Sequence, residues 1–143
     1  MDNIYLSAAK KADGGVIVRL EAYGDAISMR KPVMLYSDGD DADEQKLRLL
    51  LDFFKASGIK EYKDTYVYTD SKKLVTQWKK YRKEGAEIPT GVWEDLFTYM
   101  RENLLFCPVF KAEGTLSRVL AAELQEYVAF VERGGKHHVR SST

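Results

Sequence analysis

The segment from residue 65 to residue 83 constrains the fold of this chain more than any other. Residues 65–69 (TYVYT) are β-branched or aromatic, which is typical of a strand. Asp70 and Ser71 follow at once, and a helical pattern then continues to about Lys83. The apolar positions of that helix are Leu74, Val75 and Trp78. A strand that runs directly into a helix predicts a sheet with helices packed against it.

The first third of the chain predicts three short strands joined by turns. Residues 3–9 (NIYLSAA), 16–23 (VIVRLEAY) and 26–36 are rich in apolar side chains, and glycine-containing turns separate the three segments. An acidic loop over residues 37–44 leads into a helix, because negative charge is favoured at the start of a helix. The apolar stripe of this helix, at positions i, i+3, i+4 and i+7, is Leu47, Leu50, Leu51 and Phe54.

Two further helices and one strand complete the pattern. We predict a helix around residues 93–100, a strand over residues 104–111 and a last helix over residues 116–131. The expected order is βββαβααβα, which indicates an α/β fold with a five-stranded mixed sheet flanked by helices. We expect residues 1–133 to form one domain and residues 134–143 to form a polar, flexible tail.

The charge balance gives no global electrostatic signal. The chain has 22 Lys and Arg residues and 22 Asp and Glu residues, so a nucleic-acid site must be a local patch. No apolar run approaches the roughly 18 residues of a membrane span, and the N-terminus lacks a signal-peptide pattern. A cytoplasmic location with no membrane partner is therefore expected. Cys107, His137 and His138 are not expected to bind metal or to act in catalysis.

The sequence YVYTDS at residues 66–71, together with the order of elements, resembles the type 1 ribonuclease H family. In that family a strand ends in T-D-S and the next helix starts there. IYLSAA at residues 4–9 is similar to the family's first strand, VWEDL at residues 92–96 to a later helix, and residues 121–127 to the closing helix. The resemblance implies a ribonuclease-H-like fold. Enzymes of the family hydrolyse the RNA strand of an RNA–DNA hybrid with two divalent metal ions.

The family mechanism depends on acidic side chains. Two Mg²⁺ ions about 4 Å apart repel each other, so several converging carboxylates must hold them. The resemblance places the family's first carboxylate at Ser7 and the second at Lys46. A serine hydroxyl is neutral, and a lysine brings positive charge toward the metal site. The resemblance therefore implies a degenerate active site with no bound metal, and a need for Mg²⁺ or Mn²⁺ only if the chain is active.

Asp70 corresponds to the family's third carboxylate and is retained. For the fourth carboxylate, in the closing helix, two alignments place either Ala122 or Glu123 at the acidic position. Glu44 is close to Lys46 in the sequence and is an alternative for the second. Asp70 is thus the expected ligand if any metal binds, with Glu44 and Glu123 as alternative catalytic residues. Asp70 also has a purely structural interpretation, because an aspartate between a strand and a helix is a good N-cap.

The helix that follows Asp70 carries the strongest sign of binding. Residues 71–83 (SKKLVTQWKKYRK) are rich in lysine and arginine and contain no acid. Its cations could neutralise phosphates, and Trp78 could stack on a base. The alternative is that Trp78 belongs to the core while the lysines are only solvated. The candidate nucleic-acid-binding residues are Lys72, Lys73, Trp78, Lys79, Lys80, Arg82 and Lys83.

Three functions are compatible with these residues. The first is a domain that binds nucleic acid, either an RNA–DNA hybrid or a duplex backbone, without efficient cleavage. The second is a protein-interaction module, such as an inhibitor or a scaffold subunit. The third is an active metal-dependent ribonuclease with an altered set of carboxylates: Asp70, Glu44 and Glu123. We expect the first function, in which the chain is not an enzyme.

Overall fold

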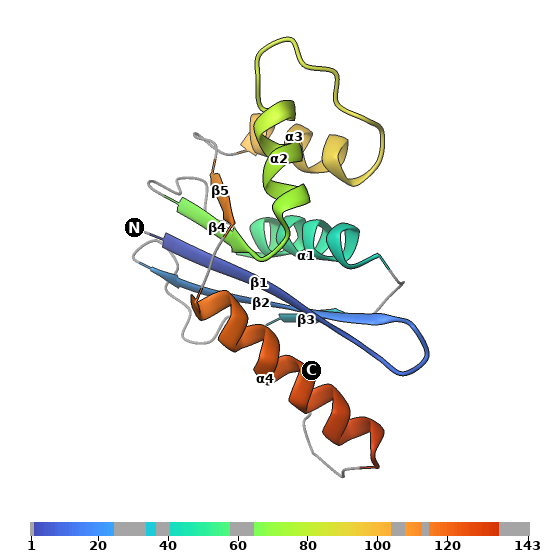
Figure 1. Cartoon of the computed structure of the whole chain (residues 1–143). Helices are drawn as coiled ribbons and strands as arrows, with labels where there is room; N and C mark the ends of the chain where they lie inside the picture. Colours follow the sequence, from blue (N-terminus) through green and yellow to red (C-terminus); the bar gives the residue numbers. More distant parts are fainter. Residues whose placement is uncertain are drawn as a thin grey trace.

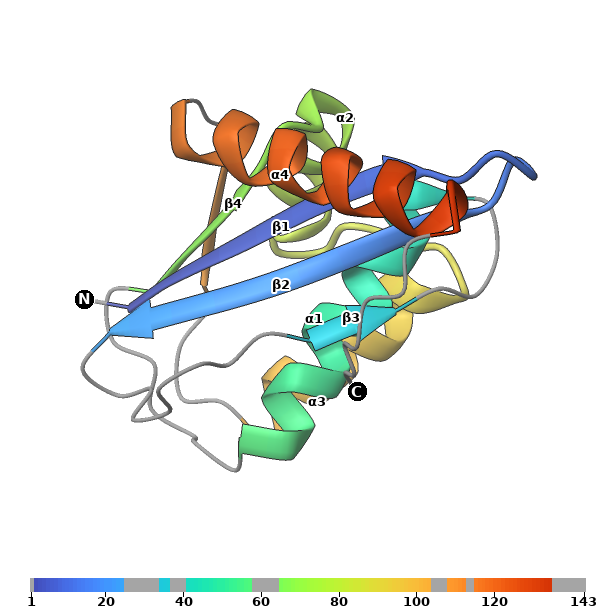
Figure 2. The ribbon, with the colours of Figure 1, turned by 90° about the horizontal axis from the view of Figure 1, so that it is seen from below.

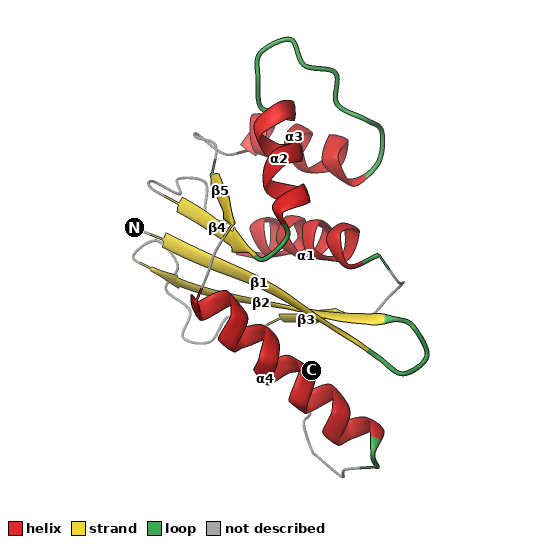
Figure 3. Cartoon of the chain, viewed as in Figure 1, coloured by secondary structure: helices red, strands yellow, loops and turns green. Residues whose placement is uncertain are grey.

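The computed structural model describes residues 2–24, 34–36, 41–57, 65–103, 108–112 and 115–134. Figures 1 and 3 show a sheet with helices on both sides of it. In chain order the elements are β1 (Asp2–Lys10), β2 (Val16–Gly24), β3 (Met34–Tyr36), α1 (Ala42–Ser57), β4 (Thr65–Thr69), α2 (Lys72–Tyr81), α3 (Val92–Asn103), β5 (Val109–Ala112) and α4 (Thr115–Glu132).

The strands form a mixed sheet in the order β3-β2-β1-β4-β5. β1 lies in the centre, antiparallel to β2 and parallel to β4. β5 pairs parallel with β4 at one edge, while β3, at the other edge, has only three residues. The prediction of a mixed α/β fold with helices flanking a sheet is confirmed. The central position of β1 brings its residues next to those of both β2 and β4.

Alternation along the strands divides the sheet into two faces. Ile4, Leu6 and Val67 belong to the main core, which also contains buried side chains of α1, α2 and α3. On the opposite face Ala9 packs against Leu124 and Val128 of α4. Figure 2 shows α4 lying across β1 and β2, with α1 and α3 behind the sheet. The odd-numbered residues of β1 therefore face α4 and the even-numbered ones face the main core.

The structure refines several predicted boundaries. α2 ends at Tyr81 rather than at Lys83, and the backbone N–H of Arg82, the C-cap residue, closes its last turn by donating to the carbonyl of Trp78 at 3.0 Å. None of the described helices has the combination of length and hydrophobicity that a membrane span requires. The predicted segments that lie outside the described residues are residues 26–33 of the third strand, 37–40 of the acidic loop, 104–107 with Cys107, and the tail from residue 135 with His137 and His138.

Candidate functional site

Asp70 lies directly after β4, where the chain turns into α2. The N-cap of α2 is Ser71, whose hydroxyl accepts a hydrogen bond from the backbone N–H of Leu74 at 3.2 Å. The interpretation of Asp70 as the helix cap is therefore wrong. Its carboxylate is half exposed and is available for another partner.

That partner is Lys46, from the second turn of α1. The Lys46 side chain is 97% buried, with only 3% of its surface exposed, and its ammonium lies 2.8 Å from Oδ1 of Asp70. The same ammonium donates to the hydroxyl of Thr69 at 3.1 Å. A buried ammonium is stable only when acceptors replace its lost water, and these two side chains at the end of β4 supply them. α1 thus holds a fixed positive charge against the end of β4.

Ser7 lies on the neighbouring strand at the same level as Asp70. The parallel pairing of β1 with β4 ends at Tyr5 and Tyr68, so Ser7 and Asp70 are each two residues past the last pair. Ser7 is buried, with 3% of its surface exposed. Its neutral hydroxyl therefore stands on the strand next to Asp70, where the family resemblance places a carboxylate.

The other two candidate carboxylates also have basic partners. Glu44 lies 3.3 Å from Arg48 on the next turn of α1, and Glu123 lies 3.5 Å from the guanidinium of Arg19 in β2. Arg19 also donates to the carbonyl of Leu120 at 3.1 Å, which fixes it against α4. Among the described residues, Asp70, Glu44 and Glu123 do not form one metal-binding cluster, and each of the three has its own cationic partner.

A pair of divalent cations needs several converging anionic ligands. Within the described residues no group of three His, Cys, Asp or Glu side chains is placed to hold a metal ion. The donors at this position are Asp70, a neutral Ser7 and the ammonium of Lys46. This donor set does not fit two divalent cations, because the ammonium already occupies the space beside the retained carboxylate.

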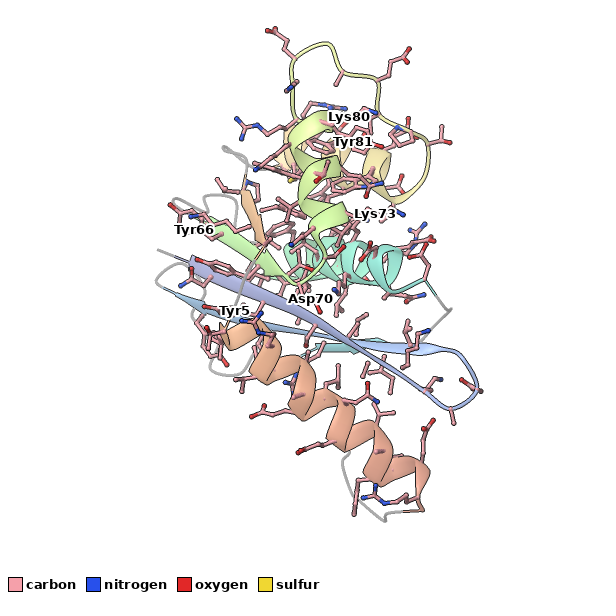
Figure 4. The ribbon with its side chains drawn as sticks, viewed as in Figure 1. Tyr5, Tyr66, Asp70, Lys73, Lys80 and Tyr81 are labelled. Atoms are coloured by element: carbon pink, nitrogen blue, oxygen red, sulfur yellow. The ribbon has the colours of Figure 1, made fainter. Side chains whose placement is uncertain are left out.

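The outer surface of α2 is basic, as the sequence predicts. Leu74, Val75 and Trp78 are buried, whereas the cations of residues 71–83 are exposed. Figure 4 shows Lys73 and Lys80 on α2, on the side of the sheet away from α4. We define the basic surface as Lys72, Lys73, Lys79, Lys80, Arg82 and Lys83. In the described part of the chain no carboxylate forms an ion pair with any of these residues.

Lys73 differs from the other members of the basic surface. It lines a cavity of about 240 Å³ between α1, α2 and the start of α3, together with Asp41, Asp43 and Glu44. These carboxylates reduce the positive potential around Lys73. Lys79 and Lys80, in the last turn of α2, are therefore better representatives of the basic surface in an experiment.

Trp78 does not belong to the exposed surface. It is 1% exposed, and its ring stacks on Phe110 with centroids 5.5 Å apart and an angle of 11° between the planes. The guanidinium of Arg82 lies 4.8 Å from the Trp78 ring on its outer side. The prediction that Trp78 stacks on a base is therefore wrong. The alternative is confirmed, because Trp78 is a core residue beside Leu74 and Val75.

Comparison with known proteins supports the fold. No family model and no curated protein matches the chain. Among solved structures, LC11-RNase H1 in complex with an RNA/DNA hybrid has a TM-score of 0.59 at 13% identity, covering 87% of this chain and 93% of that one. RNase H1 from the archaeon Halobacterium salinarum NRC-1 has a TM-score of 0.55 at 14% identity, with 90% and 96% covered. The N-terminal RNase H domain of a Mycobacterium tuberculosis protein has a TM-score of 0.57 at 14% identity, with 86% and 94% covered.

The fold is ribonuclease-H-like. Within it, Lys46 and Asp70, both identified from the sequence, contact each other directly. Sequence reasoning missed Arg19, the partner of Glu123. The sequence does show that Arg19 alternates with the apolar residues Val18 and Leu20 and so points to the other face of the sheet. That pattern does not identify Glu123 as the partner.

Proposed function

We propose that this chain is a nucleic-acid-binding domain that does not cleave its ligand efficiently. The ligand is the backbone of an RNA–DNA hybrid or of another duplex, bound on the basic surface. The observation that carries the proposal is this row of exposed cations on α2, which has no carboxylate partner among the described residues. Two solved structures of the same fold contain nucleic acid: LC11-RNase H1 with an RNA/DNA hybrid, and a foamy viral protease-reverse transcriptase with double-stranded DNA.

The spacing of the cations suits a phosphate backbone. Lys72 and Lys79 are seven residues apart, as are Lys73 and Lys80, which is about 10.5 Å along a helix axis. One face of α2 thus carries positive charge at both of its ends. Arg82 and Lys83, which follow the helix, extend this basic surface. Each phosphate that such a surface neutralises releases condensed counterions, so binding is expected to weaken steeply with salt.

The absence of efficient cleavage follows from Lys46 and Ser7. A divalent cation next to Asp70 would have to displace a buried ammonium that has two acceptors, and it would gain no charge from Ser7. The Coulomb repulsion between the ammonium and a divalent ion opposes binding. We therefore propose that the Lys46 ammonium takes the electrostatic role of a cation at this position and stabilises the fold instead of supporting hydrolysis.

The test is the salt dependence of binding to a fluorescent RNA–DNA hybrid, measured by anisotropy. Lys79→Glu/Lys80→Glu should lower the affinity and reduce the slope of log affinity against log salt by about 1.8, since each phosphate contact contributes about 0.9. Lys10→Glu/Arg133→Glu is a charge-matched control on β1 and at the end of α4. Equal affinity and slope in the wild type and in Lys79→Glu/Lys80→Glu would refute the proposed surface.

A protein-interaction module is the second candidate function, and a specific feature of α4 favours it. Leu116, Val119, Phe130 and Val131 are between 41% and 47% exposed, which gives α4 apolar surface that a partner protein could cover. A partner protein that co-purifies in stoichiometric amount after nuclease treatment would support this function. If every captured partner disappears with nuclease, the protein-interaction function is ruled out.

A further inference from the structure

Four tyrosines form a continuous group on the sheet face opposite the main core. Tyr5 lies in β1, Tyr23 in β2, and Tyr66 and Tyr68 in β4, and we call them the tyrosine face. The pairing register places them side by side: Asn3 is opposite both Tyr23 and Tyr66, and Tyr5 is opposite Tyr68. Strand alternation therefore directs residues from three adjacent strands to one side.

The rings contact one another in sequence across the sheet. Tyr5 and Tyr68 stack with centroids 4.9 Å apart and an angle of 14° between their planes. Tyr23 meets Tyr5 edge to face at 6.2 Å, and Tyr66 lies 6.3 Å from Tyr68. These contacts hold the outer rings, Tyr23 and Tyr66, at fixed positions on either side of the central pair.

α4 leaves this end of the sheet accessible. Its buried contacts reach Ala9 and Arg19, toward the other end of β1, whereas Tyr23 is 51% exposed. In Figure 4, Tyr5 on β1 and Tyr66 on β4 both lie away from Lys80 and Tyr81 on α2. The tyrosine face is thus a surface separate from the basic surface.

Two polar groups accompany the rings. The ammonium of Lys111, an exposed residue of β5, lies 4.6 Å from the centre of the Tyr66 ring. The amide oxygen of Asn3 is buried between the strands of Tyr23 and Tyr66 and has no hydrogen-bond partner among the described residues. A cation beside an aromatic surface can neutralise a phosphate.

We propose that the tyrosine face binds single-stranded nucleic acid, with unpaired bases stacked on the outer rings and a phosphate near Lys111. Aromatic side chains on adjacent strands of a sheet, with a neighbouring cation, are a known arrangement for stacking unpaired bases. A duplex does not fit this chemistry, because its bases are already stacked on each other. This inference goes beyond the proposed binding of a duplex backbone on α2 and does not depend on it.

The experiment measures binding of a short fluorescein-labelled single strand, as DNA and as RNA of the same sequence, by anisotropy. Tyr66→Ala should weaken binding by roughly 5-fold to 150-fold, the range for loss of one base–aromatic stack. Tyr66→Phe keeps the ring and should bind like the wild type. Lys111→Gln should reduce the affinity without removing a ring, and Lys79→Glu/Lys80→Glu should retain most single-strand binding.

Three results would overturn the proposal. The first is that the wild-type chain binds no single strand. A tyrosine face that captures a protein but no oligonucleotide would count as this result. The second is equal affinity in the wild type, Tyr66→Ala and Lys111→Gln. The third is loss of binding in Lys79→Glu/Lys80→Glu alone, which would place the strand on α2 instead.

Hydrogen exchange of the wild type provides a check that needs no variant, in case Tyr66→Ala does not fold. Protection of β4 and β5 by saturating oligonucleotide would support the proposal. Protection confined to α2 would overturn it. Either outcome can be read independently of whether the duplex proposal succeeds, because the two surfaces lie on different faces of the sheet.

Discussion

The ammonium of Lys46 lies 2.8 Å from the carboxylate of Asp70, and the two residues come from α1 and from the end of β4. Lys46 is buried while Asp70 is half exposed. The cost of burying the pair falls mainly on the lysine, whose charge must be compensated within the protein. This relationship has consequences for stability that can be measured separately from nucleic-acid binding.

Removing only the acid should destabilise the fold more than removing both partners. In Asp70→Ala the buried ammonium keeps Thr69 but loses its anionic partner, which should lower the free energy of unfolding by about 2 kcal/mol. Lys46→Met/Asp70→Ala removes both charges and should recover most of that loss. Urea denaturation of both variants tests this, with Glu44→Ala as a control that should cost less than about 0.5 kcal/mol. If Asp70→Ala and Lys46→Met/Asp70→Ala lost equal free energy of unfolding, the unpaired ammonium of Lys46 would not be the cause of the destabilisation.

Restoring carboxylates should create a metal site. Ser7→Asp/Lys46→Glu would place two acids from β1 and α1 beside Asp70 and remove the competing ammonium. We expect Mn²⁺ or Mg²⁺ to raise the melting temperature of this variant, since a ligand that binds only the folded state stabilises it. The neutral control Ser7→Asn/Lys46→Gln should not respond. A wild-type chain stabilised by the metal as strongly as the double variant would show that the native donors already suffice.

Trp78 should behave as a core residue. Its substitution by Ala should lower the free energy of unfolding by about 3–5 kcal/mol, because it removes a fully buried ring stacked on Phe110. Trp78→Phe keeps an aromatic partner and should cost less. Chemical denaturation gives both values. If Trp78→Ala were as stable as the wild type but bound nucleic acid more weakly, the ring would act in binding after all.

Alkaline pH should weaken the fold through Tyr23. Partial burial and the hydrogen bond from its hydroxyl to Glu21 raise the pKa of Tyr23 above its ordinary value of 10.0. The folded state therefore holds this proton more firmly than the unfolded state, so the stabilisation is present below pH 10 and is lost as the pH rises through the folded-state pKa. The free energy of unfolding should fall more steeply above pH 10 in the wild type than in Tyr23→Phe. Parallel curves for the two proteins would exclude this contribution.

The local patterns of the sequence predicted the elements well because they depend on neighbours in the chain. The β-branched and aromatic run at residues 65–69 gives β4, and the spacing of Leu74, Val75 and Trp78 gives the buried side of α2. The alternative interpretation of Asp70 as the helix cap was one residue early, because the cap is Ser71. Both types are good caps, and the choice depends on the backbone turn after β4, which the sequence alone does not define.

The candidate site was only partly predictable because its contacts join distant segments. Matching the apolar stripe of α1 placed Lys46 near Asp70, which the ion pair between them bears out. The pairing of Arg19 with Glu123 depends on how α4 packs across β2, and nothing local to either residue indicates it. The tyrosine face has the same origin, because the register between β1, β2 and β4 decides which rings meet.

The central claim is that the chain binds a nucleic-acid duplex without cutting it. The most direct measurement is cleavage of an end-labelled RNA–DNA hybrid in Mg²⁺ and in Mn²⁺, at protein concentrations where anisotropy shows the same hybrid to be bound. We predict that the hybrid is bound and its RNA strand remains intact. Metal-dependent cleavage by the wild type that Asp70→Asn abolishes would contradict the claim and assign an active site to the carboxylate that Lys46 now holds.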